Sequence, residues 1–397
     1  MITVGSDFSG VGAFNQALKR LNIEYKEIFA CDMDKYARQT FLHNYGEPLY
    51  YPNNVYNREI PNQSLDIYMT SPPCQAFSLA GKRLGKEDKR GILFFNSHEF
   101  IKVNKPRFFI FENVKGLLSD DNGKTFKEWL NMLGGKSING NAVLFRYEEA
   151  VDYHIYWKVL NAKDYGIPQN RERVFIVGIR DDKDNFFNFP AEEFLTKRLK
   201  DILEENVEEK YFLSEKAVKH LEIYKERHDK KGTGFGVELK DENSVASTLR
   251  ANGALCPTDN HLKINSDIHN CIKEAIGRQG SSSEYIDSLK KVNEALKEKR
   301  QQGVISYTRD SKGKVISRHI NQQANTIHSA TGGGGNTDQF YTDGYKIRRL
   351  TPRECFRLMD FPDNFSWNVS DSQAYKQAGN SICVGVLAKI INNLKLF

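Results

Sequence analysis

Short apolar runs rich in β-branched and aromatic residues alternate with helix-like stretches across residues 1–180, and this alternation constrains the fold most. The runs are Ile2–Val4, Tyr25–Cys31, Leu65–Thr70, Arg107–Glu112, His154–Leu160 and Val174–Ile179. Such alternation is typical of a mostly parallel sheet with helices on both faces. We therefore expect an α/β fold with a doubly wound, Rossmann-like sheet.

The pattern changes after about residue 181. Charged stretches at 194–209, 214–230 and 281–303 are predicted to be helical, and the Gly- and Asn-rich segments 251–260 and 329–342 to be loops. Helix signals return at 351–354 and 381–396. This order predicts a first domain at 1–190 completed by 365–397, a second, smaller, irregular lobe at 191–347, and a connecting segment at 348–364.

Composition excludes several classes of protein. The chain has 397 residues, of which 39% are hydrophobic and 27% charged, and its net charge is +6. No apolar run reaches membrane-spanning length, and no secretory signal is visible at the N-terminus. Six scattered cysteines indicate free thiols in a reducing compartment, so we expect a cytoplasmic protein. Region 181–347 carries 26 Lys and Arg against 27 Asp and Glu, so attraction to phosphates is expected from the flanking parts.

Cys74 follows the third apolar run in the segment Ser71-Pro72-Pro73-Cys74-Gln75. The two prolines restrict the backbone that leads to the thiol, which places it at a strand end, where open α/β sheets bind ligands. A buried structural cysteine is the alternative for this segment taken alone.

The loop Asp7-Phe8-Ser9-Gly10-Val11-Gly12 lies between a predicted strand and a helix predicted at 13–21. Its glycines allow a ligand to approach the backbone, and the helix N-terminus offers free N–H groups. Asp32 ends the next strand, where a carboxylate can bind ribose hydroxyls. An exposed strand end or a helix cap is the alternative for Asp32.

Charged side chains stand at the ends of two later strands. Glu112 ends an apolar run and is expected to have a raised pKa, unless it caps a helix or forms an ion pair. Gln169, Arg171 and Arg173 alternate along an extended segment and are predicted to share a face. Two guanidinium groups on one face can bind a carboxylate, a phosphate or a carbonyl, although a solvated basic edge strand has the same pattern.

Taken in series, these motifs closely resemble the cytosine-C5 DNA methyltransferases of prokaryotic or phage type, which depend on S-adenosylmethionine. The resemblance covers nearly all of 1–180 and 346–397. The motifs are Phe8-Ser9-Gly10-Val11-Gly12, Pro72-Pro73-Cys74-Gln75, Arg90-Gly91-Ile92-Leu93-Phe94, Glu112-Asn113-Val114, Gln169-Asn170-Arg171-Glu172-Arg173, Arg353-Glu354-Cys355 and Gln377-Ala378-Gly379-Asn380-Ser381.

The resemblance implies a catalytic role for four residues. The Cys74 thiolate would add to C6 of a flipped-out cytosine, and Glu112 would hold or protonate N3. Arg173 would hold the base O2, while Arg171 steadies the pocket. C5 then takes the methyl group, loses its proton, and the thiol is eliminated. The loop 77–89 would close over the base.

The resemblance also implies ligand contacts. Phe8 would stack on the adenine, Asp32 would bind the ribose, and Asn380 and Ser381 would line the methionine side. The full expected set for S-adenosyl-L-methionine, and for the product S-adenosyl-L-homocysteine, is Phe8, Ser9, Gly10, Gly12, Asp32, Met33, Asn54, Pro72, Leu93, Asn380 and Ser381. The expected DNA contacts are Gln75, Ser78, Lys82, Arg90, Thr326, Ile327, Gly332 and Gly333.

Three positions depart from the family pattern. The family often has an Asp two residues before the Phe of the first loop, where this chain has Ser6 followed by Asp7. Asp32-Met33 replaces the usual Glu and its large apolar neighbour. Asn54 stands where an Asp commonly contacts the adenine amino group.

The lobe 191–347 takes the place of the target-recognition domain. Two of its segments resemble each other, 245–253 and 324–332, and the second fits the DNA-contacting position of the family better. Cys256, His261, His269 and Cys271 lack the spacing of paired zinc ligands, so no metal is predicted.

These observations predict a sequence-specific DNA (cytosine-5-)-methyltransferase that acts as a monomer on double-stranded DNA in the cytoplasm, associated with the nucleoid. Its expected context is DNA methylation in a restriction–modification system, with a cognate restriction endonuclease acting on the same site. A tRNA cytosine-C5 methyltransferase and a non-catalytic DNA-binding relative are the alternatives. The large middle lobe disfavours the tRNA enzyme, and the intact catalytic residues disfavour the non-catalytic protein.

Overall fold

The structure is a computed structural model. It describes residues 1–73, 92–180, 186–214, 239–250, 260–265, 303–309, 315–321, 339–342 and 345–396, together with scattered positions from 217 to 230. The chain divides into two compact units. Unit 1 comprises Met1–Val207, Phe235–Asn260 and Leu350–Phe397, and unit 2 comprises Glu208–Gly234 and His261–Arg349.

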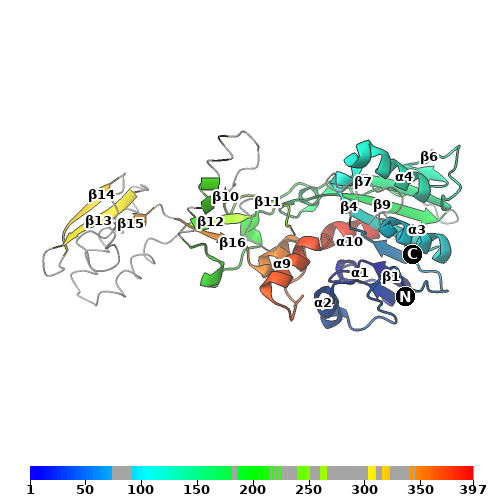
Figure 1. The fold of residues 1–397 in the computed structure, drawn as a ribbon, viewed down its shortest axis with the longest axis horizontal. Helices are drawn as coiled ribbons and strands as arrows, with labels where there is room; N and C mark the ends of the chain where they lie inside the picture. Colours follow the sequence, from blue (N-terminus) through cyan, green and yellow to red (C-terminus); the bar gives the residue numbers. More distant parts are fainter. Residues whose placement is uncertain are drawn as a thin grey trace. The chain divides into compact units, whose positions relative to one another are not determined.

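Unit 1 is built on an eight-stranded sheet with the order β2-β1-β3-β4-β9-β7-β5-β6. Figure 1 labels β1, β4, β9, β7 and β6 of this sheet. The strands are β1 (Ile2–Asp7), β2 (Tyr25–Cys31), β3 (Ile67–Thr70), β4 (Phe108–Val114), β5 (Ser137–Ile138), β6 (Asn141–Ala142), β7 (Tyr153–Asn161) and β9 (Glu172–Arg180). β1 to β4 pair in parallel, whereas β9 is antiparallel to both of its neighbours. The expected doubly wound, Rossmann-like α/β fold is confirmed.

The helices of unit 1 connect and cover these strands. They are α1 (Ala13–Arg20), α2 (Lys35–Tyr45), α3 (Ile92–Asn104), α4 (Lys124–Leu133), α8 (Pro352–Leu358), α9 (Asp371–Asn380) and α10 (Val384–Asn392). Phe109 and Phe111 of β4 join a core cluster with residues of α3 and α4. Phe108 and Ile110, which point to the opposite face, are equally buried, so the sheet is covered on both sides.

The segment that returns to unit 1 after residue 349 begins with a strongly capped helix. Thr351 Oγ1 accepts the Glu354 N–H, and the Glu354 carboxylate accepts the Thr351 N–H, at the start of α8. Pro352 occupies the first turn, as the sequence predicts. The closing helix α10 is almost wholly buried and packs against α1, so the two ends of the chain build one domain.

Unit 2 contains two small antiparallel sheets among its described residues. β12 (His261–Asn265) pairs with β16 (Tyr345–Arg349). β13 (Gly303–Arg309) lies between β14 (Val315–Asn321) and β15 (Gln339–Thr342). The unit boundary differs from the predicted domain boundary, because 191–207, 235–260 and 350–364 belong to unit 1.

The helix predicted at 194–209 is wrong. This stretch contains one short 3-10 turn, at Leu199–Asp201, and a second, Glu209–Tyr211, begins at its last residue. The amides of Leu199 and Lys200 donate to the carbonyls of Ser244 and Glu242, at 3.0 and 2.7 Å, instead of to a preceding helical turn. A distant segment therefore takes the hydrogen bonds that a helix would have used. The described positions from 217 to 230 are helical, whereas 281–302 lies outside the described residues.

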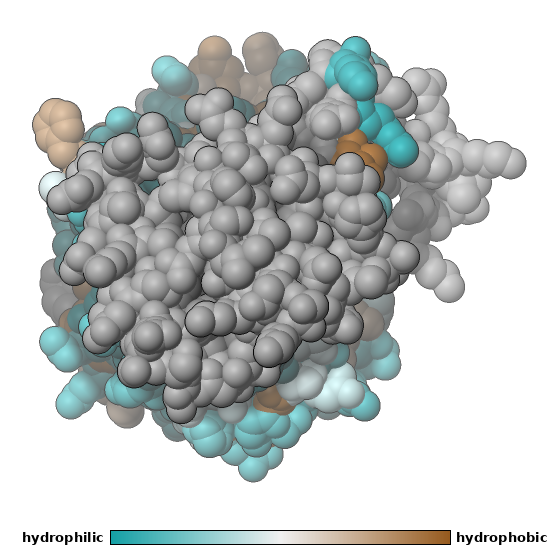
Figure 2. Space-filling view, turned by 90° about the vertical axis from the view of Figure 1, so that its left-hand side faces the viewer, coloured by the Kyte–Doolittle hydropathy of each residue, from teal (hydrophilic) through white to brown (hydrophobic). Residues whose placement is uncertain are grey.

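On the face drawn in Figure 2, the coloured residues are mostly hydrophilic, and apolar side chains form separate spots. No helix among the described residues is long and apolar enough to cross a membrane.

Candidate active site

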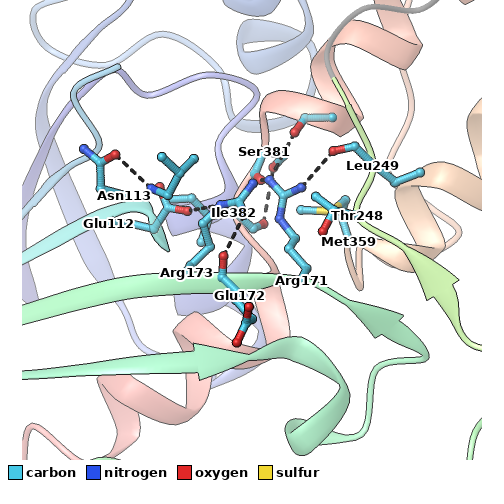
Figure 3. A network of polar contacts seen from close by, with 12 residues as sticks. Glu112, Asn113, Arg171, Glu172, Arg173, Thr248, Leu249, Met359, Ser381 and Ile382 are labelled. Carbon is cyan, nitrogen blue, oxygen red and sulfur yellow. Dashed lines mark hydrogen bonds and ion pairs between the residues drawn. The ribbon is translucent and has the colours of Figure 1, made fainter. Parts of the chain in front are cut away.

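Glu112 lies near the carboxyl end of β4 and is buried, with 8% of its surface exposed. Its Oε1 is 3.1 Å from Nε of Arg173, which belongs to the neighbouring strand β9 (Figure 3). Burial raises the pKa of Glu112, and the charges of Arg173 and Arg171 oppose that rise. The arrangement gives a carboxyl group that can retain a proton and is held in one orientation by a cation.

Arg171 lies at the junction of β8 (Gln169–Asn170) and β9 and binds backbone carbonyls of three residues. Its guanidinium donates to the carbonyls of Leu249 (3.1 Å), Gly379 (3.1 Å) and Ser381 (2.7 Å). Burial, reinforced by the Arg173 charge, lowers the pKa of Arg171 to about 10. The alternative of a solvated basic edge strand is excluded, because Arg171 is only 3% exposed.

Gln169 and Arg171 both hold the C-terminal segment, whereas Arg173 faces Glu112. The Gln169 side chain donates to the Leu358 carbonyl at 3.0 Å, at the end of α8. The three residues predicted to share a face therefore divide into two that fix the backbone and one that pairs with the buried acid.

The segment around Thr248 and Leu249 completes this network. β11 (Ala246–Ser247) pairs in parallel with β8, and Thr248 Oγ1 donates to the Asn170 carbonyl at 2.7 Å. Thr248 and Leu249 belong to the segment 245–253, which resembles 324–332 and was the less favoured of the two as a DNA-contacting segment. The contact of Leu249 with Arg171 was not predicted, because the sequence of 245–253 gives no sign of the residue that it binds. The preferred member, 324–332, lies outside the described residues, together with Thr326, Ile327, Gly332 and Gly333.

The strand end that leads to Cys74 is attached beside Glu112. Asn113 Nδ2 donates to the Pro72 carbonyl at 3.0 Å, and both residues are buried. Sequence reasoning included Asn113 in a motif without assigning it a role. The only sign of this role in the sequence was that Asn113 carries an amide near the end of an apolar strand. Cys74 itself lies outside the described residues, as do Gln75, Ser78, Lys82 and Arg90.

The loop after β1 is held by the carboxyl end of β2. The Gly10 N–H donates to Asp32 Oδ2 at 2.8 Å, and the Ser9 N–H donates to the Cys31 carbonyl at 3.0 Å. Gly12 has φ +84°, and a Cβ there would collide with the Tyr45 ring. Gly10 has φ +55° with open space where its Cβ would stand, so a ligand can approach this part of the loop.

Asp32 is not the cap of the following helix. Asp34 caps α2 by accepting the N–H groups of Tyr36 and Ala37, while Asp32 Oδ1 accepts the Asp34 N–H at 2.8 Å. Burial raises the pKa of Asp32. Each of its oxygens accepts one backbone hydrogen bond and keeps acceptor capacity for a vicinal diol. These acceptor sites are compatible with ribose hydroxyls, and the ribose contact of Asp32 stays a prediction.

The other predicted ligand residues lie on several elements around this loop. Phe8 has φ +56° and is half-buried, whereas Met33 is 86% exposed. Asn54 Oδ1 already accepts the Tyr56 N–H at 2.9 Å. Leu93, on α3, packs against the core cluster.

Asn380 and Ser381 lie at the end of α9, which is fastened to α2. Lys376 pairs with Asp34 at 2.6 Å, and Thr40 Oγ1 donates to the Gln377 side chain at 3.1 Å. Asn380 is exposed and Ser381 is buried. Because Asp34 follows Asp32 by two residues, these contacts bring the C-terminal segment close to the Asp32 end of β2.

Comparison with known proteins identifies the family. The family described as C-5 cytosine-specific DNA methylase matches residues 2–396. The chain is 32% identical over 445 residues to the orphan methyltransferase M.SPRI of Bacillus phage SPR, covering 99% of this chain and 97% of that protein. It is 32% identical over 382 residues to the type II methyltransferase M.HpaII of Haemophilus parainfluenzae, covering 95% and 84%.

Solved structures share the fold at lower identity. A DNMT2 variant from Spodoptera frugiperda has a TM-score of 0.61 at 18% identity, covering 99% of each chain. The Entamoeba histolytica methyltransferase EhMeth has a TM-score of 0.61 at 18% identity, covering 99% of this chain and 98% of that one. At this identity the likeness concerns the fold.

Proposed function

The chain belongs to the C-5 cytosine-specific DNA methylase family and is a DNA cytosine-C5 methyltransferase, and from that premise we propose how its own residues carry out the reaction. The observation that carries the proposal is the buried Glu112–Arg173 pair next to Asn113, which holds the strand end leading to Cys74. A Cys74 thiolate at this strand end would lie near the Glu112 carboxyl group and the Arg173 guanidinium.

Cys74 is proposed to add as a thiolate to C6 of a flipped-out cytosine. Electron density then flows toward N3, where the protonated Glu112 donates a hydrogen bond or its proton. Arg173 holds the base O2 and orients Glu112, and Arg171 fixes the backbone around them. After methyl transfer, loss of the C5 proton and elimination of the thiolate restore the aromatic ring and free Cys74.

We propose that this enzyme uses S-adenosyl-L-methionine, the methyl donor that its family uses in general. When bound, the donor supplies the methyl group and leaves as S-adenosyl-L-homocysteine. The chemistry of the loop fits it, because the Asp32 carboxylate can accept from ribose hydroxyls and the space at Gly10 is open. We assign Phe8, Met33 and Asn54 to the adenine side. The remaining predicted residues, Ser9, Gly10, Gly12, Pro72, Leu93, Asn380 and Ser381, are assigned to the loop and the methionine side.

Recognition of a particular DNA sequence is assigned to unit 2 and the segments that join it to unit 1. We further propose that the enzyme acts on double-stranded DNA as a monomer, in the cytoplasm and associated with the nucleoid, with a cognate restriction endonuclease cutting the same site. Gln75, Ser78, Lys82 and Arg90 remain the predicted DNA contacts beside the catalytic cysteine, and Thr326, Ile327, Gly332 and Gly333 those of the recognition segment.

Expression in a host without cytosine methylation, followed by bisulfite sequencing, tests this proposal. Wild-type protein should methylate one sequence motif, and Cys74→Ser should leave the DNA unmodified at equal expression. Residual methylation by the Cys74→Ser variant would refute the covalent step. Unmodified DNA together with methylated tRNA would favour the tRNA enzyme instead. The same sequencing identifies the recognition motif.

A further inference from the structure

The last residue of β1, Asp7, forms a buried ion pair that the reaction does not use. Arg58 donates to its carboxylate through Nε (2.9 Å to Oδ1) and Nη2 (2.8 Å to Oδ2), and Tyr68 Oη donates to Oδ2 at 2.6 Å. The side chains of Asp7 and Arg58 are 0% and 2% exposed. Asp7 is therefore closed off from any ligand, although it directly precedes Phe8.

Arg58 connects three segments of unit 1. It belongs to the connection between α2 and β3, it binds β1 through Asp7, and its Nη2 also donates to the Asn96 carbonyl of α3 at 3.2 Å. The guanidinium carbon lies 4.7 Å from the ring centroid of Phe100, also on α3. A planar fork that binds a carboxylate and stacks on a ring has one orientation, so it fixes the relative positions of these segments.

Each of the three segments carries a residue assigned to the methyl donor. Phe8 follows Asp7 directly, Asn54 lies four residues before Arg58, and Leu93 is on α3, three residues before Asn96. The turn that contains Asn54 closes just before Arg58, because the Asn57 N–H donates to the Asn54 carbonyl at 3.4 Å. The position of this turn relative to Phe8 therefore depends on the Asp7–Arg58 pair.

Stability alone does not account for such a pair. Removing two charges from water costs several kcal/mol per ion, and apolar residues of similar volume at buried pairs are often neutral or stabilising. A buried pair that is costly to form but rigid is better explained by the geometry that it imposes. Here the pair fixes the position of Phe8 relative to the turn that contains Asn54, and both residues are assigned to the adenine side.

We propose that Arg58 is a positioning residue for the methyl donor: by binding Asp7 and the Asn96 carbonyl, it holds the Asn54 turn in register with Phe8. The inference rests on the proposed cofactor site. It also explains why the Asp of the first loop stands one residue before Phe8, at Asp7, and not two residues before it. Asp7 binds Arg58, and the proposed ribose contact is made by Asp32.

The test replaces the pair by apolar residues of similar size, in Asp7→Leu/Arg58→Met. Calorimetry with S-adenosylhomocysteine should show a Kd about tenfold higher than wild type, which is a change of about 1.4 kcal/mol. At saturating donor, kcat and the KM for DNA should stay within about twofold, because Arg58 touches neither reactant. The melting temperature should remain equal or rise, because no unpaired charge is left.

Two comparisons keep the inference falsifiable. Arg58→Lys, which retains the charge and loses the fork, should raise the Kd by a smaller factor than the double variant. Arg357→Met/Asp363→Leu removes another bidentate pair of unit 1, in which Arg357 contacts Asp363 at 2.7 and 3.1 Å, and should leave the Kd unchanged.

An unchanged Kd in the Asp7→Leu/Arg58→Met and Arg58→Lys variants would overturn the inference and leave the proposed function standing. A lower melting temperature with unchanged Kd would likewise reduce Arg58 to a structural role. Absence of binding by the wild-type protein would overturn the cofactor site and the inference together.

Discussion

Two carboxyl groups of unit 1, the buried Glu112 and the half-buried Glu27, have different neighbours and different consequences. Glu112 faces the Arg173 guanidinium, whereas Glu27 of β2 accepts from the neutral Asn15 amide at 2.6 Å. Burial raises the pKa of Glu27 to about 8, and the Asn15 hydrogen bond opposes the rise. Glu112 was predictable from its place at a strand end. Glu27 was not, because a Glu within a strand gives no sign of which side of the sheet it faces.

Glu27 should make the stability of the enzyme depend on pH. Its pKa is higher in the folded state, about 8, than its ordinary 4.5, so the folded protein binds the proton more tightly. The resulting stabilisation is full below about pH 4.5 and is lost as the pH rises toward 8. Glu27→Gln, which keeps the acceptor for Asn15, should be more stable than wild type by ~2 kcal/mol at pH 8.5.

Thermal unfolding at pH 6, 7 and 8.5 measures this difference. The matched control is Glu149→Gln, since Glu149 is an exposed partner of Lys102 and should contribute little at any pH. An equal slope of melting temperature against pH in wild type and Glu27→Gln would contradict the prediction.

Glu112 should produce an alkaline limb in the activity profile. Burial raises its pKa, and the protonated form that is proposed to act at N3 disappears as the pH rises through that value. Glu112→Gln should lower kcat/KM by about 10²-fold and remove this limb. Steady-state rates from pH 6 to 9 check both effects. A Gln variant that keeps the alkaline decline would assign the limb to another group.

At the level of elements, the parallel strands were readable from sequence and their antiparallel neighbour was not. β2, β3 and β4 each follow a helix, and the apolar runs of β3 and β4 are continuous because both faces are covered. The direction of β9 depends on its pairing with β4 and β7, which no local pattern encodes. The helix wrongly predicted at 194–209 has the same origin, since the amides of Leu199 and Lys200 bind the distant carbonyls of Ser244 and Glu242.

The contact between β4 and the end of β3 should be important for catalysis. Asn113→Ala removes the amide that holds the Pro72 carbonyl and should lower kcat by about 10- to 100-fold, because the backbone leading to Cys74 is no longer fixed. Binding of S-adenosylhomocysteine should change little. Asn188→Ala, which removes a similar bond to the Phe186 carbonyl, is the control. An unchanged kcat would show that the anchor is dispensable.

At the level of the whole molecule, unit 1 depends on contacts between residues more than 300 positions apart. Arg20 of α1 forms an ion pair with Asp360, beside Gly385 of α10. The sequence predicted that the C-terminal segment completes the first domain. It did not predict that the segment begins as early as Leu350, because the capped start of α8 reads equally well as part of a linker.

Gly385→Ala tests this closure. A helical Gly→Ala change would ordinarily stabilise by up to ~1 kcal/mol, but a Cβ here collides with the Asp360 carboxylate and displaces it from Arg20. We expect a net loss of ~1–2 kcal/mol in the free energy of unfolding, measured by urea denaturation. Gly116→Ala, where the nearest atom is 3.9 Å away, is the matched control. A more stable Gly385→Ala variant would show that the Asp360 side chain can move away from the new Cβ without a loss of stability.

The pairing of β12 with β16 has a consequence for the evolution of specificity. His261 and Arg349, the first and last residues of the longer part of unit 2, are register partners, so the chain leaves and returns within about 5 Å. Any stretch that begins and ends in such a pair can be spliced in without altering the spacing of the flanking residues. Recombination between related genes at these two points would exchange the intervening cassette whole, and, under the proposed assignment of DNA recognition to unit 2, the target sequence would change with it in one event.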